Sequence, residues 1–224
     1  MQTPAEKFLV QRLVAFLSSY DTNLNVHQIL NAGAGQSISI EQQLTLSGCR
    51  YTCDRADVEG CEVAFPAVRK CWQCSIDNMS PIPSECYIAM FANYVLEHVE
   101  NIRGASREIF RVLAPGGLFI ATVPNNSAPE FILAKYTPLW FHKLIRGGTG
   151  WETKYAYDSI SQLIDLFIEV GFQVEDEEYW SWVGGYLSKY PILGSLGKLY
   201  DKLIATCNYR RFMGQVCLVL KKPL

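Results

Sequence analysis

Hydrophobic residues along the 224-residue chain follow two different spacings, and each spacing predicts one kind of element. Within residues 1–26, apolar side chains recur every three or four positions, which is typical of an amphipathic helix. A short apolar run at 28–32 predicts a strand that leads into a glycine loop. Between 38 and 46 the apolar residues fit neither period well, and we expect a short helix there.

Four apolar stretches then alternate with helical or turn patterns. Strands are expected at 50–58, near 71–77, at 86–93 and at 118–125. The stretch 86–93 is apolar almost throughout, as expected of a parallel strand that is buried on both faces. A helix is expected over 95–113, and the Pro-Gly pair after it predicts a type II turn. This alternation predicts a doubly wound, mostly parallel α/β sheet of the Rossmann-like kind.

The regular alternation stops after Asn125. Residues 126–157 are rich in aromatic side chains and too long for an ordinary connection, so we expect an insertion that serves as a lid. A helix is expected over 158–172, with Asp158 as its N-cap and Gly171 just past its end.

The last part of the chain supplies two more strands. They are expected at 172–177 and 213–222, and a second insertion, 181–210, separates them. Because no ordinary crossover helix joins them, we expect an antiparallel pair at one edge of the sheet. The predicted fold class is therefore a single α/β domain, 1–224, with a doubly wound seven-stranded sheet whose last strand is antiparallel.

Charge and hydropathy narrow the classes of partner. The formal net charge is −2 and 49% of the residues are hydrophobic, with a sequence pI of about 5.9. Because no overall positive field exists, we expect no nucleic-acid partner. No uninterrupted apolar run approaches the ~20 residues of a membrane-spanning helix, so any contact with a membrane is expected at its surface.

Eight cysteines raise the question of disulfides or a metal site. The N-terminal segment lacks the layout of a signal peptide, so we expect reduced thiols in a cytoplasmic protein. Cys71 and Cys74 form a Cys-x-x-Cys pair, but no second pair stands at zinc-ligand spacing. We expect these two as small buried residues and predict no metal site.

Polar and glycine residues lie near the ends of the predicted strands. Ligands of open α/β sheets bind beyond the carboxyl ends of the strands, which brings Gly33, Gly35, Asp54, Asp77 and Asn93 to one crevice. Glycines allow close approach of a ligand, a carboxylate after the second strand accepts both ribose hydroxyls, and a further carboxylate accepts from an adenine amino group. The set describes an adenosine pocket. The loop lacks the third glycine of dinucleotide-binding folds, which disfavours NAD.

The segment 77–125 carries a more specific pattern. It reads DNMSPIPSECYIAMFANYVLEHVENIRGASREIFRVLAPGGLFIATVPN. This stretch resembles the class I S-adenosylmethionine-dependent methyltransferases, in the branch with a Leu-Glu-His helix start and a Leu-x-Pro-Gly-Gly turn. The resemblance covers about 27–125 well and the final helix and strands loosely, and it does not extend to the two insertions.

The resemblance implies S-adenosylmethionine as cofactor, with S-adenosylhomocysteine as the product. It implies that Asp54 binds the ribose, although Asp57 competes for that role. The other implied cofactor residues are Asn31, Gly33 and Gly35 around the methionine portion, Ile76, Asp77 and Asn78 around the adenine, and Ala92 and Asn93 at the end of the fourth strand.

The chain also departs from the family pattern. Asn31 stands where the family usually has an acidic residue, Ser37 stands where it has a third small residue, and Tyr87 and Ile88 replace a Phe-Asp pair. An amide at position 31 still forms hydrogen bonds but brings no negative charge toward the methionine ammonium. Reduced affinity for the cofactor is the expected consequence.

Two histidines are candidates for a catalytic base. His98 follows a helix start that faces the crevice, and His142 lies in the predicted lid. The structural alternatives are a half-buried, hydrogen-bonded His98 and an exposed His142.

The sequence thus predicts methyl transfer from S-adenosylmethionine to a small-molecule or lipid-like acceptor. The aromatic residues of the insertions fit a hydrophobic substrate or shallow bilayer contact. The alternative is a non-catalytic relative that kept the sheet and acts as a binding module, and a weaker third hypothesis is a nicotinamide-dependent oxidoreductase.

Overall fold

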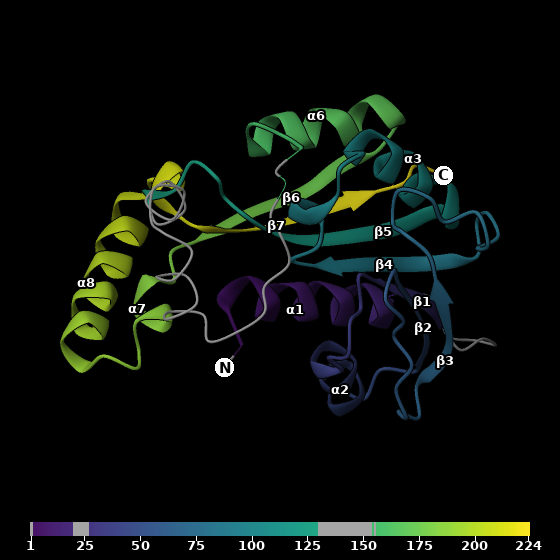
Figure 1. Cartoon of the computed structure of the whole chain (residues 1–224), viewed down its shortest axis with the longest axis horizontal. Helices are drawn as coiled ribbons and strands as arrows, with labels where there is room; N and C mark the ends of the chain where they lie inside the picture. Colours follow the sequence, from purple (N-terminus) through teal and green to yellow (C-terminus); the bar gives the residue numbers. More distant parts are fainter. Residues whose placement is uncertain (1, 20–26, 130–153, 155) are drawn as a thin grey trace.

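A seven-stranded sheet in the order β3-β2-β1-β4-β5-β7-β6 organises the molecule (Figure 1). The structure is a computed structural model that describes residues 2–19, 27–129, 154 and 156–224. The strands are β1 (His27–Ala32), β2 (Tyr51–Asp57), β3 (Val68–Gln73), β4 (Tyr87–Asn93), β5 (Leu113–Pro124), β6 (Gln173–Trp180) and β7 (Gln215–Lys221).

The direction of the strands confirms the predicted fold class. Strands β1 to β5 pair in parallel, whereas β7 runs antiparallel to both β5 and β6. Strand β7 lies between β5 and β6, and no crossover helix packed on the sheet joins β6 to it. A strand that returns beside its predecessor without such a crossover runs in the opposite direction. The sheet is therefore doubly wound and mixed, with an antiparallel last strand.

Helices cover both faces of the sheet, and each face has its own hydrophobic core. Helices α1 (Pro4–Ser19) and α2 (Ser39–Leu46) lie on one face, and α3 (Ile102–Val112) and α6 (Ile160–Val170) lie on the other (Figure 1). Leu9 and Leu13 of α1 are fully buried in the first core, as the N-terminal periodicity predicts. In the second core, the rings of Phe119 and Phe167 stack with centroids 5.5 Å apart.

Capping residues decide where the helices begin, and two predicted starts are wrong. The helix expected from residue 95 begins only at Ile102, because the Asn101 carboxamide accepts a hydrogen bond from the Gly104 N–H and caps the helix there. A short 3-10 helix, η1 (Leu96–His98), precedes it. The N-cap of α6 is Ser159 and not Asp158, since the Ser159 hydroxyl accepts from the Gln162 N–H. Gly171 ends α6 with φ of 116°, as predicted.

Strand boundaries also differ from the prediction in ways that affect the site. Strand β3 ends at Gln73, so residues 74–77 form the connection beyond it rather than its last residues. Strand β2 ends at Asp57, which leaves Asp54 in the middle of the strand. Strand β5 begins at Leu113 and so includes the segment 114–117 that was predicted as a turn before it.

The second predicted insertion, 181–210, contains α7 (Val183–Tyr186) and α8 (Pro191–Cys207), and the 3-10 helix η2 (Arg210–Phe212) begins at its last residue. The predicted lid, 126–157, lies mostly outside the described residues. Within the described ranges, no helix is both long enough and apolar enough to cross a membrane.

Candidate active site

A cleft of about 360 Å³ opens beyond the carboxyl ends of β1, β2 and β4. Strand β1 lies between β2 and β4. The strand order therefore runs outward in one direction through β2 and β3 and in the other through β4 and β5, which makes β1 and β4 the switch point where open α/β sheets bind ligands. The walls come from Gly33, Asp57 and Val58, from residues 74–77 after β3, from residues 94, 95 and 98–100 after β4, and from Lys154.

Two glycines with positive φ shape the loop after β1. Gly33 has φ of 65°, and a Cβ added to it would come within 2.3 Å of Val95 Cγ2, so only glycine fits beneath that side chain. Gly35 has φ of 52°, and a Cβ added there would meet no atom within 4 Å. The second glycine therefore faces open space, which leaves room for a ligand to approach the backbone closely, but unlike Gly33 it is not among the residues that line the cleft.

Asp57 ends β2 at the edge of the cleft. Its Oδ2 accepts a hydrogen bond from the Gly35 N–H at 2.9 Å, and its Oδ1 accepts from the Glu59 N–H at 3.0 Å. Each carboxylate oxygen has a second lone pair. The side chain is thus held in place by backbone donors while it keeps capacity to accept two further hydrogen bonds from a ligand.

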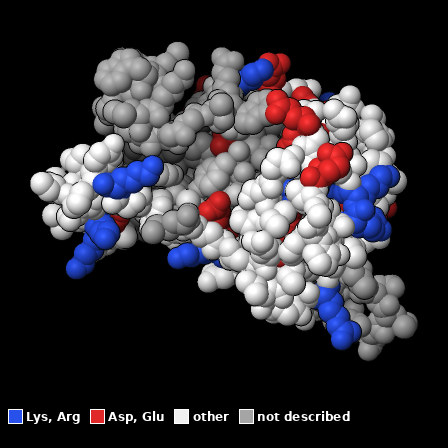
Figure 2. Space-filling model, turned by 60° about the horizontal axis from the view of Figure 1, so that its bottom comes forward, with Lys and Arg blue, Asp and Glu red and all other residues white. Residues whose placement is uncertain are grey.

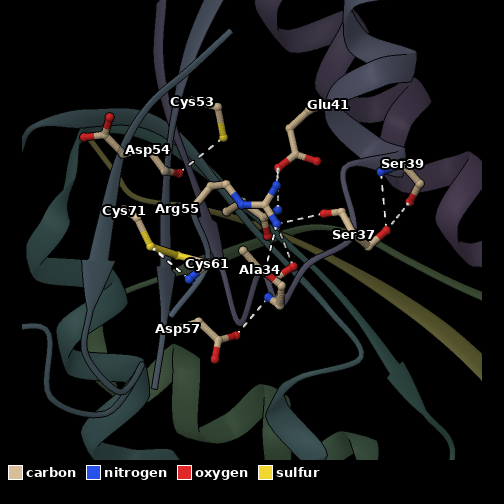
Figure 3. A network of polar contacts seen from close by, with 12 residues as sticks. Ala34, Ser37, Ser39, Glu41, Cys53, Asp54, Arg55, Asp57, Cys61 and Cys71 are labelled. Carbon is tan, nitrogen blue, oxygen red and sulfur yellow. Dashed lines mark hydrogen bonds and ion pairs between the residues drawn. A yellow bond between two sulfur atoms is a disulfide. The ribbon is translucent and has the colours of Figure 1, made fainter. Parts of the chain in front are cut away.

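A buried ion pair supports the same loop from below (Figure 3). Arg55 Nη2 donates to the carbonyls of Ala34, Gly35 and Ser37 at 2.8–3.1 Å. Arg55 Nη1 lies 3.1 Å from Glu41 Oε1, and both side chains are fully buried. One guanidinium on β2 therefore fixes three carbonyls of the glycine loop, and a carboxylate from α2 balances its charge.

Asn31 belongs to this network and not to the cleft wall. Its Nδ2 donates to Glu41 Oε1 at 2.8 Å, and the residue is 5% exposed. The carboxylate that position 31 lacks is thus supplied within the network by Glu41. Neither Glu41 nor Arg55 was predicted as a site residue. The available signal was that both charged residues occupy positions within elements that the fold buries.

Asp54 does not line the cleft, so its predicted position at the end of β2 is wrong. It is 1% exposed and pairs with Arg69 through two hydrogen bonds of 2.9 and 2.8 Å. Tyr87 and Trp72 also donate to its Oδ2. Burial acts to raise the pKa of Asp54, but these hydrogen bonds outweigh it and lower the pKa below the ordinary value. In Figure 3 its carboxylate points away from Arg55.

The predicted adenine residues divide between the cleft and its surroundings. Ile76 and Asp77 line the cleft, and Asp77 accepts a hydrogen bond from the Ser75 hydroxyl. Asn78 is exposed and does not belong to the lining. Cys74, which was expected only as a small buried residue, does belong to it, and burial raises the pKa of its thiol.

Neither Ala92 nor Asn93 is among the residues of the cleft wall. Ala92 is fully buried in the core. The Asn93 side chain donates to Glu6 of α1 at 2.9 Å and accepts from the Thr122 hydroxyl at 2.6 Å. These two residues lie behind the cleft, where they join β4 to its neighbours.

Residues 30–121 match the family model described as a methyltransferase domain. Over these 92 of the 224 residues, the chain is similar to that family. No curated protein matches the chain significantly. This similarity supports S-adenosylmethionine as the cofactor.

Solved structures share the fold at low sequence identity. A methyltransferase dependent on S-adenosylmethionine from Archaeoglobus fulgidus is 12% identical with a TM-score of 0.59, and the match covers 97% of this chain and 94% of that one. One from Mesorhizobium loti is 13% identical with a TM-score of 0.57, covering 92% and 96%. Phosphoethanolamine N-methyltransferase 2 from Haemonchus contortus is 12% identical with a TM-score of 0.57, covering 96% of this chain and 53% of that one. These likenesses establish the fold.

The candidate base His98 also belongs to the cleft wall. His98 lines the cleft near Glu100 and Lys154, and its Nε2 lies 3.9 Å from Glu97 Oε1. It is partly buried, as the structural alternative for this residue expected. His142, the second candidate base, lies outside the described residues.

A disulfide lies next to the cleft and corrects the prediction of eight reduced thiols. Cys61 is bonded to Cys71 of β3, with the two Cα atoms 5.8 Å apart. The chain after β2 turns back toward β3 and brings these residues together, which the Cys-x-x-Cys spacing of Cys71 and Cys74 did not indicate. Cys74 is a free, partly buried thiol.

Proposed function

We propose that the protein transfers a methyl group from S-adenosylmethionine to a small-molecule or lipid-like acceptor. The observation that carries the proposal is Asp57: a carboxylate at the end of β2, fixed by backbone donors, in the wall of a cleft that Gly33 also lines. The family match supports the cofactor, and the aromatic residues of the insertions favour a hydrophobic acceptor.

The residues of the cleft fit the cofactor in size and in chemistry. A volume of about 360 Å³ falls within the range of small-molecule sites. The open space above Gly35 accommodates a ligand against the loop backbone. Asp57 offers two acceptor oxygens, as a ribose with two hydroxyls requires.

Each predicted cofactor residue has a role in this proposal. Gly33 and Gly35 border the methionine portion, and Ile76 and Asp77 border the adenine. Asp57 replaces Asp54 as the residue that binds the ribose hydroxyls. The remaining four, like Gly35, stand outside the cleft wall: Asn31 acts through Glu41, Ala92 and Asn93 pack behind β4, and Asn78 forms a backbone hydrogen bond to Ser75.

S-adenosylmethionine, when bound, supplies a methyl group that its sulfonium already activates. The protein's own contribution is to align the acceptor with that group and to exclude water. His98, at the cleft, accepts a proton from an acceptor that arrives protonated. His142 remains a sequence-based candidate for the same task.

Calorimetric titration with S-adenosylhomocysteine tests the proposal with two matched carboxylate variants. Asp57→Ala removes both acceptors for the ribose, so we expect the Kd to rise about 100-fold. Asp54→Asn changes a carboxylate three residues away in the sequence that faces the core, so we expect its Kd to stay within about two-fold of native. NAD is the control ligand, and we expect no binding.

The opposite pattern of affinities would locate the ribose at Asp54 after all. Folded protein that binds neither sulfur compound at millimolar concentration would refute methyl transfer and favour the non-catalytic binding module.

A further inference from the structure

Helix α8 is attached to the molecule by one narrow face. Gly194, Gly197 and Ile204 are its buried residues. A Cβ added to Gly197 would come within 2.7 Å of Gly184 Cα in α7, so the backbones of the two helices are in direct contact at these glycines. Asp201, on the same face, accepts hydrogen bonds from the Ser181 hydroxyl and from the N–H groups of Val183 and Gly184. This face of α8 therefore packs against α7 and the residues just before it.

The opposite side of α8 presents a continuous apolar stripe. Ile192, Leu196, Leu199 and Leu203 are separated by four, three and four residues, which places them on one side of the helix. They are 78%, 58%, 65% and 58% exposed. Scattered exposed leucines are ordinary, but a contiguous set of this kind marks an interaction surface. We call these four residues the α8 stripe.

Positive charge borders the α8 stripe on one side. Lys198 and Lys202 each precede a stripe leucine by one position, about 100° around the helix, so they flank the stripe on one side. Over 181–212 the basic residues number five and the acidic residues one, although the whole chain has a net charge of −2. The single acidic residue, Asp201, is the one turned toward α7. In Figure 2, the end of the molecule at the left is largely uncharged with isolated blue groups.

Exposed aromatic side chains also lie in the segments just before and just after α8. The exposed aromatic residues next to α8 are Tyr186, Tyr190, Tyr209 and Phe212, each at least 40% exposed. Tyrosine combines an apolar ring with a polar tip, which suits the boundary between lipid headgroups and acyl chains. An apolar helix face with a basic border and adjoining aromatic residues is the composition of a helix that lies in a membrane interface.

We propose that the α8 stripe docks the protein onto an anionic phospholipid surface. Charge selects this occupant: a second copy of the chain would bring the same lysines against one another, whereas acidic headgroups complement them. The leucines enter the acyl boundary while Lys198 and Lys202 remain at headgroup level. This docking does not depend on methyl transfer, so vesicle binding tests it separately from the proposed function.

Sedimentation of the full chain with vesicles is the test. Vesicles of phosphatidylcholine with about one third phosphatidylserine are the probe, and pure phosphatidylcholine vesicles are the reference. We expect binding to the anionic vesicles that weakens as salt is raised. The triple substitution Leu196→Ser, Leu199→Ser, Leu203→Ser should lower the partition coefficient more than about 100-fold. Leu46→Ser, at a leucine that is 85% exposed on α2, is the matched control and should have no effect.

The charges are tested in the same assay. Lys198→Gln with Lys202→Gln should lower partitioning about 30-fold, since each basic residue near an anionic surface contributes roughly five-fold. Arg50→Gln with Arg107→Gln removes two exposed charges elsewhere and should leave partitioning unchanged. Melting temperatures of all variants should match the native value, because these side chains are exposed.

Three results would overturn the proposal. The first is native protein that stays in the supernatant with anionic vesicles. The second is equal binding by native protein and the leucine triple variant. The third is a dimer in light scattering that the triple variant abolishes while vesicle binding is absent, which would make the α8 stripe an interface between copies.

Discussion

Removing the charge of Arg55 is the sharpest test of how the glycine loop is held. Arg55→Met leaves the Glu41 carboxylate buried without its counter-charge, and it takes the donor away from the carbonyls of Ala34, Gly35 and Ser37. Glu41 Oε2 is already buried without a hydrogen-bond partner in the described part of the chain. Breaking one side of a buried ion pair costs about 3–5 kcal/mol. We therefore expect the free energy of unfolding to fall by about 4 kcal/mol.

A second variant separates charge from packing. Glu41→Gln keeps the shape of the side chain and an oxygen that accepts from Asn31, but it carries no charge. In the double variant, Arg55→Met with Glu41→Gln, no isolated charge is left in the core. The double variant should therefore be more stable than Arg55→Met alone by about 2 kcal/mol.

Urea unfolding followed by tryptophan fluorescence measures these differences, with an exposed ion pair as control. Arg103 and Glu169 form a salt bridge in which both side chains are about half exposed. Arg103→Met should cost less than about 1 kcal/mol. An Arg55→Met variant as stable as this control, or a double variant no more stable than Arg55→Met, would refute the idea that a buried charge pair supports the loop.

Three further predictions concern single features. Asp54 has a lowered pKa, so its stabilising contribution is present above the ordinary value of 3.8 and is lost as the pH falls through the lower folded value. Asp54→Asn should therefore lower the free energy of unfolding by about 2 kcal/mol at neutral pH. The same variant should make the free energy of unfolding depend less on pH at the acid end of the curve. Gly33→Ala forces an L-residue into φ of 65° and against Val95, and should cost about 3 kcal/mol in urea unfolding, with part of that regained by Val95→Ala. Reduction of Cys61–Cys71 should lower the free energy of unfolding by about 2–3 kcal/mol, and reductant should have no effect on a variant with serine at both positions.

The sequence analysis identified the architecture because strands and helices of a doubly wound sheet leave local patterns. Strand β4 is buried on both faces and is apolar almost throughout, and α1 is buried on one face and carries apolar residues at helical spacing. The glycine loop was recognised for a similar local reason, since positive φ at Gly33 and Gly35 requires glycine. Features that depend on one residue's own neighbours in the sequence were therefore predicted well.

The errors concern residues whose roles depend on distant contacts. Asp54 and Asp57 lie three positions apart on one strand, and only the point where β2 ends decides which of them reaches the cleft. The resemblance assigned Asn31 to the methionine portion, but a contact with Glu41 on another element holds its side chain. The end of the fourth strand and the resemblance assigned Asn93 to the pocket, but its side chain bonds to Glu6, 87 residues away on α1. No periodicity in the sequence encodes such contacts.

A crystal structure of the protein with S-adenosylhomocysteine tests the central claim most directly. The account predicts the ligand in the cleft beyond β1, β2 and β4, with both ribose hydroxyls on the Asp57 carboxylate and the adenine beside Ile76 and Asp77. Ligand bound elsewhere, or a ribose that does not contact Asp57, would contradict it.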